Sequence, residues 1–285
     1  GSIKEAIESG AEVLILGIAP SGGKIPKEWN PVIEVALNAG LSIVNGLHDL
    51  LMPTWGKHIQ NSEKQWIWDV RVPQFVPQIA TAQAAALSNK RVLFVGTDMA
   101  VGKMTAALEL YSYLLRIDTN VGFVATGQIG ITITGKGIPL DAFKVDHACG
   151  AVEQMVVDQK DKDIVLIEGQ GSLLHPGSTA TLPLMRGSCP THLVLCLRAE
   201  KETLRSPIDI RIPDINQFIA LNESLCSVFG TYPDAKVIGI AANTSMFSEE
   251  EAKNYIQQLE EKTNIPVTDP IRYGMQEIGD IISSN

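Results

Sequence analysis

Short apolar runs alternate with amphipathic stretches along most of the chain. Near the N-terminus the pattern predicts a helix from residue 3, a strand over Val13–Ala19, a helix over Pro31–Ala39 and a strand over Leu41–Val44. Apolar runs separated by helical patterns are typical of strands that a parallel sheet buries on both faces. The chain is therefore expected to begin with a small Rossmann-like α/β domain.

The same alternation resumes near residue 91. The predicted strands are Val92–Val95, Val121–Ala125, Ile164–Ile167, His192–Leu197 and Val237–Ala241, and the predicted helices are Lys103–Leu115, Asp141–Val157, Ile215–Val228 and Ser248–Lys262. Such a series folds as a doubly wound, mostly parallel sheet, and ligands of that architecture bind beyond the carboxyl ends of its strands. The fold class predicted for the whole chain is therefore α/β.

Residues 46–80 interrupt the alternation. They are irregular and hold three prolines and three of the four tryptophans, so they are the expected domain junction. We expect a Rossmann-like domain with its junction over residues 1–80 and a P-loop NTPase-like domain over residues 81–285. Because a helical pattern follows Gly1 and Ser2 directly, we also expect an earlier strand or two of the first domain to be missing from this numbering.

Composition narrows the range of partners. The formal net charge of −9 over 285 residues repels nucleic acid and anionic membranes, which favours a small-molecule ligand. No apolar run reaches the roughly 18 residues that span a bilayer, and the four cysteines form no CxxC pair. We expect a soluble, cytoplasmic protein with reduced thiols. Apolar surface in the tryptophan-rich junction further predicts a homo-oligomer.

The segment VLFVGTDMAVGKMT, residues 92–105, contains the strongest chemical signal. A strand, a glycine-bounded loop, a lysine and a helix follow one another in the order that builds a phosphate-binding loop. Five residues separate Gly96 from Gly102, one more than is usual, and Met104 stands where a magnesium-binding hydroxyl is expected. The predicted cofactor-binding residues of the loop are Gly96, Thr97, Asp98, Ala100, Val101, Gly102, Lys103, Met104 and Thr105.

Further candidates follow the other predicted strands. Glu168 and Asp146 could join Thr105 in holding Mg²⁺, which prefers oxygen ligands, although Asp146 could equally favour its own helix dipole. His175 could be a general base or a hydrogen-bonded loop residue. Asn243 follows a late strand and is a further candidate.

Substrate contacts are predicted at three residues. Gln128 and Gly130 lie in a glycine-rich excursion, and the guanidinium of Arg186 could pair with a carboxylate. For two further groups of residues, a structural role is at least as well supported as a binding role. His48, near Asp49 and His58, lacks the tight spacing of a metal cluster, and residues 21–24 (SGGK) form either a second anion nest or a solvated turn.

Two family resemblances emerge from these segments. GTDMAVGK resembles the phosphate loop of dethiobiotin synthetase, and the resemblance implies that Asp146 and Glu168 hold magnesium and that Asn243 reads adenine. The segments LGIAPSGGKIP, TGQIGITITGKGIPLDAF, IEGQGSLLHPG and IAANTSMFSEEEA extend over nearly the whole chain. They are similar to the two-domain P-loop family, long of unknown function, that includes D-glutamate N-acetyltransferase.

The resemblances imply two reactions. In the first, the loop holds acetyl-CoA, with Glu168 or His175 as the base for amino-acid N-acetylation, and Met104 fits a cofactor bound without magnesium. In the second, the loop holds Mg-ATP, and Lys103 stabilises a phosphoryl group in transfer to a carboxylate. A regulatory nucleotide-binding module without turnover is a third possibility. Acetyl transfer ranks first because its resemblance covers more of the chain.

Overall fold

The computed structural model describes residues 2–18 and 23–284, which fold as two compact units. The first unit consists of residues 1–74 together with 127–142, and the second of residues 75–126 together with 143–285. The segment 127–142 thus returns to the first unit before the chain continues in the second. Ser21 and Gly22 of the expected anion nest lie outside the described residues.

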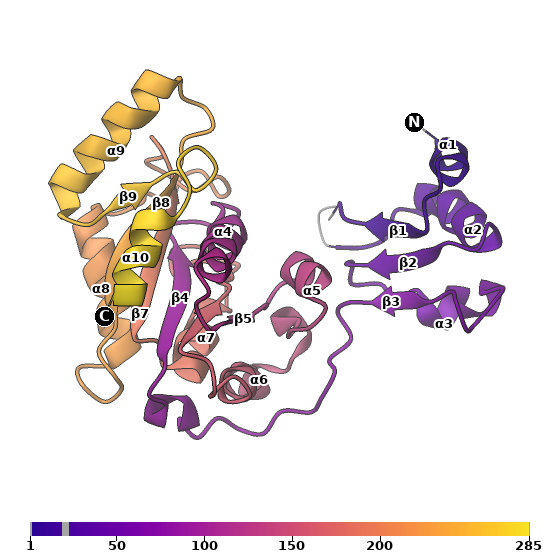
Figure 1. The fold of residues 1–285 in the computed structure, drawn as a ribbon, viewed down its shortest axis with the longest axis horizontal. Coiled ribbons are helices and arrows are strands. Elements are labelled where there is room, and N and C mark those ends of the chain that lie inside the picture. The colour runs from indigo at the N-terminus through magenta and orange to yellow at the C-terminus, as the bar shows by residue number, and fades with distance from the viewer. Residues whose placement is uncertain (1, 19–22, 285) are drawn as a thin grey trace. The chain divides into compact units, whose positions relative to one another are not determined.

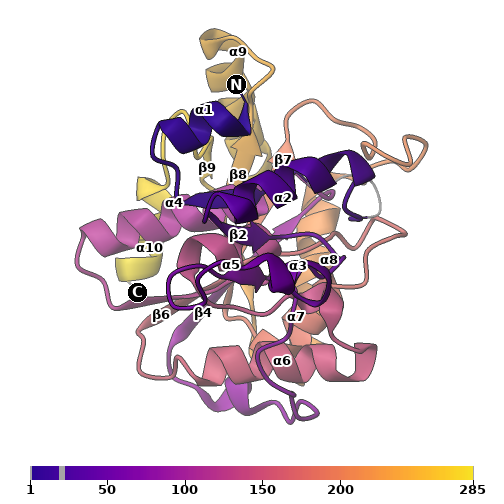
Figure 2. The same cartoon turned by 90° about the vertical axis from the view of Figure 1, so that its right-hand side faces the viewer.

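The first unit contains a three-stranded parallel sheet in the order β1-β2-β3. The strands are β1 (Val13–Leu16), β2 (Ser42–Asn45) and β3 (Ile67–Asp69), and the helices are α1 (Ile3–Glu8), α2 (Asn30–Asn38), α3 (Met52–Trp55), η1 (Lys27–Trp29) and η2 (Gly56–His58). The returning segment adds α5 (Gln128–Thr134) and η4 (Leu140–Ala142). Helices α1 and α2 pack against each other (Figure 2). β3 lies inside the expected junction and is too short to show as a pattern.

Buried polar groups connect the strand ends of this unit. The Asn45 side chain donates a 2.7 Å hydrogen bond to the Asp69 carboxylate, which also accepts the backbone N–H groups of Leu51 and Met52. Both polar side chains are buried, so these bonds satisfy groups that would otherwise be costly to bury. They hold the segment that follows β2 against the end of β3.

The second unit contains a six-stranded parallel sheet in the order β5-β6-β4-β7-β8-β9. Its strands are β4 (Lys90–Gly96), β5 (Val121–Val124), β6 (Ile164–Ile167), β7 (His192–Arg198), β8 (Lys236–Asn243) and β9 (Val267–Thr268). Its helices are η3 (Gln83–Ala86), α4 (Lys103–Arg116), α6 (Val145–Val157), α7 (Thr181–Ser188), α8 (Ile215–Ser227), α9 (Glu249–Thr263) and α10 (Gln276–Ser284). Helices cover both faces, so the predicted doubly wound α/β class is confirmed (Figure 1).

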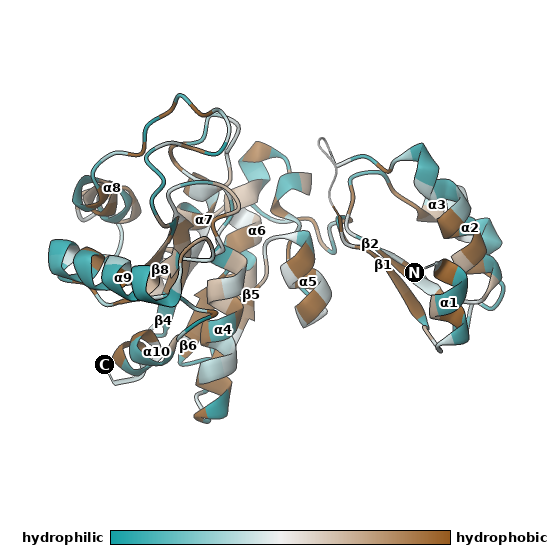
Figure 3. Cartoon of the chain, turned by 90° about the horizontal axis from the view of Figure 1, so that it is seen from above, coloured by the Kyte–Doolittle hydropathy of each residue, from teal (hydrophilic) through white to brown (hydrophobic). Residues whose placement is uncertain are grey.

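The elements of this unit agree with most of those predicted for it. Figure 3 shows α4 and α10 on one side of the sheet, and α6, α7 and α8 on the other. All five predicted strands are present, and their apolar side chains form the core. The helix expected from Asp141 begins at Val145, because Lys144 has an extended backbone at the N-cap. Helix α7 was not expected, since its segment TLPLMRGS contains both proline and glycine.

No helix within the described residues combines the length and the apolar character needed to cross a membrane.

A buried arginine stabilises the base of the six-stranded sheet. The side chain of Arg91 is only 1% exposed and donates hydrogen bonds to the carbonyl oxygens of Leu87, Asn89, Ser188 and Cys189. Burial lowers the pKa of this guanidinium. It therefore joins the start of β4 to the end of α7.

Arg91→Lys is expected to lower the free energy of unfolding by about 3 kcal/mol, because a lysine leaves several buried carbonyl oxygens without a donor. Urea denaturation of the whole chain measures the change. The matched control is Arg116→Lys at the exposed end of α4, where we expect a change below about 0.5 kcal/mol. Equal effects of the two substitutions would contradict the role of Arg91.

Candidate functional site

The loop between β4 and α4 turns through two left-handed residues. Ala100 has φ 53° and Gly102 has φ 105°, and helix α4 begins directly afterwards at Lys103. Successive N–H groups in such a loop converge on one point, and the helix N-terminus adds partial positive charge there. The local backbone thus has the form of an anion-binding loop.

Gly96 is required by a close approach within this loop. A Cβ atom at this position would lie 2.9 Å from Cγ2 of Val101, 3.1 Å from Nζ of Lys103 and 3.2 Å from the carbonyl oxygen of Cys196. These distances are shorter than ordinary carbon contacts, so a side chain at residue 96 would crowd both Val101 and the end of the Lys103 side chain. Glycine at this position leaves room for the ammonium group.

Lys103 lies in a water-poor environment. Its side chain is 6% exposed, and Nζ donates a 2.8 Å hydrogen bond to the carbonyl oxygen of Asp98. Burial lowers the pKa of this lysine, while the nearby carboxylates of Asp98 and Glu168 act in the opposite direction. Burial also raises the pKa of the Cys196 thiol to about 12, so this cysteine is neutral at pH 7. An anion in the loop would compensate the desolvated ammonium group.

Glu168 follows β6 at the same sheet edge. Its carboxylate is 2% exposed and accepts the backbone N–H of Thr126 at 2.8 Å and the side-chain amide of Gln170 at 3.3 Å. A Cβ atom at Gly169 would lie 1.6 Å from the carbonyl oxygen of Phe94, so this glycine lets the loop after β6 press against β4. The structure thus brings Glu168 and Lys103 together, as expected of residues that follow adjacent strands.

Asp98 anchors a second loop. Its Oδ1 accepts the N–H of Met99 at 2.6 Å, and its Oδ2 accepts the N–H of Arg205 at 2.7 Å. Arg205 belongs to the segment 199–213, which folds back on itself through the antiparallel bridge between Thr203 and Arg211. We call this segment the β7–α8 loop. The Asp98 carboxylate therefore holds the β7–α8 loop against the phosphate-binding loop.

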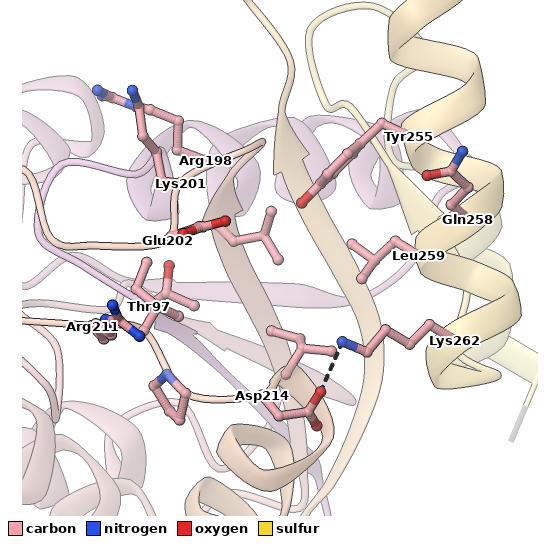
Figure 4. Close-up of a pocket in the computed structure, with 14 residues that line it drawn as sticks. Thr97, Arg198, Lys201, Glu202, Arg211, Asp214, Tyr255, Gln258, Leu259 and Lys262 are labelled. Carbon is pink, nitrogen blue, oxygen red and sulfur yellow. Dashed lines mark ion pairs between the residues drawn. The ribbon is translucent and has the colours of Figure 1, made fainter.

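Two adjoining cavities border the β7–α8 loop, with volumes of about 450 and 230 Å³; the smaller also borders the phosphate-binding loop, and the larger is closed by α9. Both are lined by Thr97, Arg198, Lys201 and Ile212. Arg205 lines the smaller cavity and Arg211 the larger, where Figure 4 shows Lys262 ion-paired with Asp214 at 2.8 Å. We call Arg198, Lys201, Arg205 and Arg211 the basic cluster. It makes the field here locally positive on an acidic chain.

The sequence analysis missed the basic cluster. The segment from Arg198 to Arg211 contains all four basic residues, and they follow β7 at the edge where ligands of doubly wound sheets bind. Their grouping after a predicted strand was the signal that could have found them.

A third cavity, of about 200 Å³, lies on another side of the phosphate-binding loop. Gly102 and Thr105 line it together with Asn243, Asp269 and Arg272. Asn243 is the last residue of β8, and its side-chain oxygen accepts the N–H of Ser245. The Asp269 carboxylate is fixed by the N–H and hydroxyl of Thr244. Thus Asn243 and Thr105 share one cavity beside the loop.

The structure places His175 and Arg186 in structural contacts. Nε2 of His175 lies 2.6 Å from the carbonyl oxygen of Ser206, and Nδ1 accepts the N–H of Gly177 at 3.1 Å. Both ring nitrogens are thus engaged, which leaves neither available as a base in this arrangement. Arg186 donates to the carbonyl oxygen of Leu225, and its guanidinium lies 5.2 Å from the centre of the Tyr232 ring.

Three further predicted positions are described by the elements that carry them. Asp146 is exposed in the first turn of α6, and Met104 is half-buried at the start of α4. Gln128 and Gly130 lie in α5, within the first unit.

The predicted magnesium ligands are Thr105, Asp146 and Glu168. In the described chain, no group of three or more His, Cys, Asp or Glu side chains is arranged to hold a metal ion. Glu168 could still contribute a carboxylate oxygen near Lys103, and the Thr105 hydroxyl lies in the adjoining cavity. A magnesium ion here would therefore depend on the phosphates of a ligand for further oxygen atoms.

Both parts of the chain match models of known protein families. Residues 1–73 match the DUF1611_N Rossmann-like domain, and residues 78–279 match the DUF1611_C P-loop domain, each described as a domain of unknown function. This chain belongs to the DUF1611 family. The predicted two-domain P-loop family is thereby confirmed.

Three relatives of this DUF1611 protein are informative. A protein from a Pseudoalteromonas species named D-glutamate N-acetyltransferase is 37% identical over 280 residues, 97% of this chain and 83% of the relative. One of the same name from Tritonibacter scottomollicae is 36% identical over 286 residues, 99% and 84% of the two chains. The crystal structure of a DUF1611 family protein from Anabaena variabilis has a TM-score of 0.94 and 44% identity, and covers 100% of this chain and 83% of that one.

Gly96→Ala is expected to weaken phosphate-ligand binding by at least about tenfold, or about 1.4 kcal/mol, because the added methyl group displaces Lys103. Calorimetric titration with CoA and with ADP measures the change. Gly17→Ala is the control, since the nearest atom to its Cβ is a side-chain carbon 3.8 Å away. Unchanged affinity in Gly96→Ala would show that the loop does not hold the phosphates.

Proposed function

We propose that this DUF1611 protein is an N-acetyltransferase that uses acetyl-CoA to acetylate D-glutamate or a similar amino acid. The observation that carries the proposal is the match, over nearly the whole chain, to two proteins named D-glutamate N-acetyltransferase. Both units fall within these matches, so the likeness extends beyond the phosphate-binding loop.

The phosphate-binding loop is the proposed site for the phosphates of coenzyme A. Lys103 supplies a desolvated cation, and the loop N–H groups supply donors. Coenzyme A carries a 3′-phosphate in addition to its diphosphate, and the basic cluster offers cations beside the loop for such a second anionic group. Met104 in place of a hydroxyl suits a cofactor that needs no magnesium.

The reaction itself is the attack of an amine on a thioester. The amine nitrogen bonds to the acetyl carbonyl carbon, the carbon–sulfur bond breaks, and coenzyme A leaves as a thiol. Lys103 and the loop position the cofactor rather than react with it. We further propose that the substrates are small molecules, that copies of the chain associate, and that the enzyme works in the cytoplasm, where its four free cysteines would stay reduced.

The third cavity favours a second candidate function. Thr105, Asn243 and Asp269 surround a pocket next to the loop where the base of a nucleotide could bind. Together with Glu168, this arrangement suits Mg-ATP and the activation of a carboxylate by phosphoryl transfer. The chemistry would then consume ATP and require magnesium.

A thermal-shift panel separates the candidates. ATP, ADP, CoA and acetyl-CoA are each added with and without magnesium, and a ligand that binds the native state raises its midpoint of unfolding. We expect acetyl-CoA and CoA to raise the midpoint without magnesium, and Lys103→Ala to abolish the shift. Lys160→Ala, an exposed lysine of the same unit, is the control.

Turnover completes this test. Release of the CoA thiol is followed with D-glutamate as acceptor, in the presence and absence of EDTA. EDTA-resistant release in the wild type, lost in Lys103→Ala, is the expected result. Magnesium-dependent ATP consumption without thiol release would establish the second candidate, and ligand binding without any turnover would point to a regulatory module.

Lys201→Ala is expected to raise the KM for acetyl-CoA by about tenfold or more, because a charged hydrogen bond to phosphate contributes about 1.5–3 kcal/mol. Lys201 lines both adjoining cavities. Dephospho-acetyl-CoA, which lacks the 3′-phosphate, should bind the wild type and the variant equally well. An unchanged KM for acetyl-CoA would remove the basic cluster from the cofactor site.

A further inference from the structure

The larger of the two adjoining cavities contains charged side chains that no contact within the protein uses. Lys201, Glu202 and Arg211 line it and are exposed. Within the part of the chain that the structure describes, their side chains make no hydrogen bond or ion pair. A volume of about 450 Å³ is typical of small-molecule sites. The cavity therefore has both the room and the uncommitted charge to bind a small polar ligand.

The fold of the β7–α8 loop brings Glu202 and Arg211 to neighbouring positions. Thr203 and Arg211 form the antiparallel bridge, and the N–H of Ile212 donates a 2.7 Å hydrogen bond to the carbonyl oxygen of Glu202. Asp98 anchors the same loop by accepting one of its backbone N–H groups. A carboxylate and a guanidinium thus project from the two arms of one loop whose backbone is held in place.

A third charged group is fixed on α9. Nζ of Lys262 lies 2.8 Å from Oδ2 of Asp214, and Oδ1 of Asp214 accepts the N–H groups of Asn216 and Gln217 at the start of α8 (Figure 4). The hydrogen bond from Lys262 lowers the pKa of Asp214. A lysine ammonium has three N–H donors, so Lys262 keeps two of them for a ligand. Asp214 therefore holds a cation at the edge of the cavity.

Tyr255 adds a neutral donor from the same helix. Burial raises the pKa of its phenol, so the hydroxyl stays protonated at pH 7. Figure 4 shows this hydroxyl and the Glu202 carboxylate pointing into the cavity. The buried side chains of Leu197, Ile215 and Leu259 form an apolar part of the wall. An apolar wall with a few directed polar groups is the usual composition of a small-molecule site.

These groups complement an amino acid with two carboxylates. Such a ligand has one ammonium group and two carboxylates, and the cavity offers one uncommitted carboxylate and several cations. Thr97 of the phosphate-binding loop also lines the cavity, so a ligand here would lie beside a cofactor held by that loop. Of the two cavities, Arg211 lines only the larger and Arg205 only the smaller. All of these residues belong to the second unit.

We propose that the larger cavity binds the amino acid that receives the acetyl group, with Glu202 binding its ammonium group and Arg211 and Lys262 its two carboxylates. This inference rests on the proposed function, which supplies the identity of the acceptor. A guanidinium meets a carboxylate through two parallel hydrogen bonds, and hydrogen bonds between charged groups are the strong ones. The cations that line the smaller cavity, Lys201 and Arg205, remain for the cofactor.

Steady-state kinetics of the full chain, with D-glutamate and acetyl-CoA varied separately, test the proposal. Arg211→Gln and Glu202→Gln should each raise the KM for D-glutamate by about tenfold or more and leave the KM for acetyl-CoA unchanged, because each removes a charged partner of the acceptor alone. Arg116→Gln and Glu277→Gln are the matched controls. These exposed residues of the same unit line neither cavity, so both KM values should stay at the wild-type level.

Calorimetric titration of D-glutamate into the protein with CoA present adds a readout that needs no turnover. The affinity should fall about tenfold in Arg211→Gln and Glu202→Gln, and also in Lys262→Gln, which changes a different element of the cavity wall. If one variant does not fold, the other two still decide the question.

The possible failures are distinct. An unchanged KM for D-glutamate in the folded variants, or a raised KM for acetyl-CoA alone, overturns the inference and leaves the proposed function standing. If the wild type transfers no acetyl group, the proposed function fails. The titration then still reports whether this cavity holds the amino acid, because unchanged D-glutamate affinity in all three variants overturns the inference independently.

Discussion

A desolvated ammonium group at the carboxyl end of a buried strand is the constraint on which the second unit depends. Gly96 leaves room for the end of the Lys103 side chain, and burial lowers the pKa of this lysine. Gly169 lets the loop after β6 approach β4 and so places Glu168 near the same group. An unliganded cation in such surroundings is costly, so the loop is suited to receive an anion.

Four basic residues are concentrated in one part of the second unit, although the chain as a whole is acidic. The formal net charge is −9, yet the β7–α8 loop places the basic cluster beside the phosphate-binding loop. Asp98 holds that loop through the N–H of Arg205, so an acidic side chain within the phosphate-binding loop positions basic ones. Local geometry, rather than net charge, therefore decides which ligands this unit attracts.

The segment 127–142 belongs to the first unit, although the chain before and after it belongs to the second. It leaves the P-loop unit after β5 and supplies Asp141 to a cluster with His48 and Arg71 before α6 begins. In the sequence these three residues are far apart and have no motif spacing. Their proximity follows from the parallel order of β1, β2 and β3 and from the return of the chain.

The sequence alone determined the α/β class, all five strands predicted in the second unit and the phosphate-binding loop, because hydrophobic period and glycine spacing are local properties. It did not show β3, which is only three residues long, or α7, whose segment contains both proline and glycine. From the sequence, His175 could be either a general base or a hydrogen-bonded loop residue, and a structural role was favoured for His48. Only the tertiary structure showed that the His175 ring is already hydrogen-bonded and that Asp141 faces His48, because partners distant in sequence are brought together by folding alone.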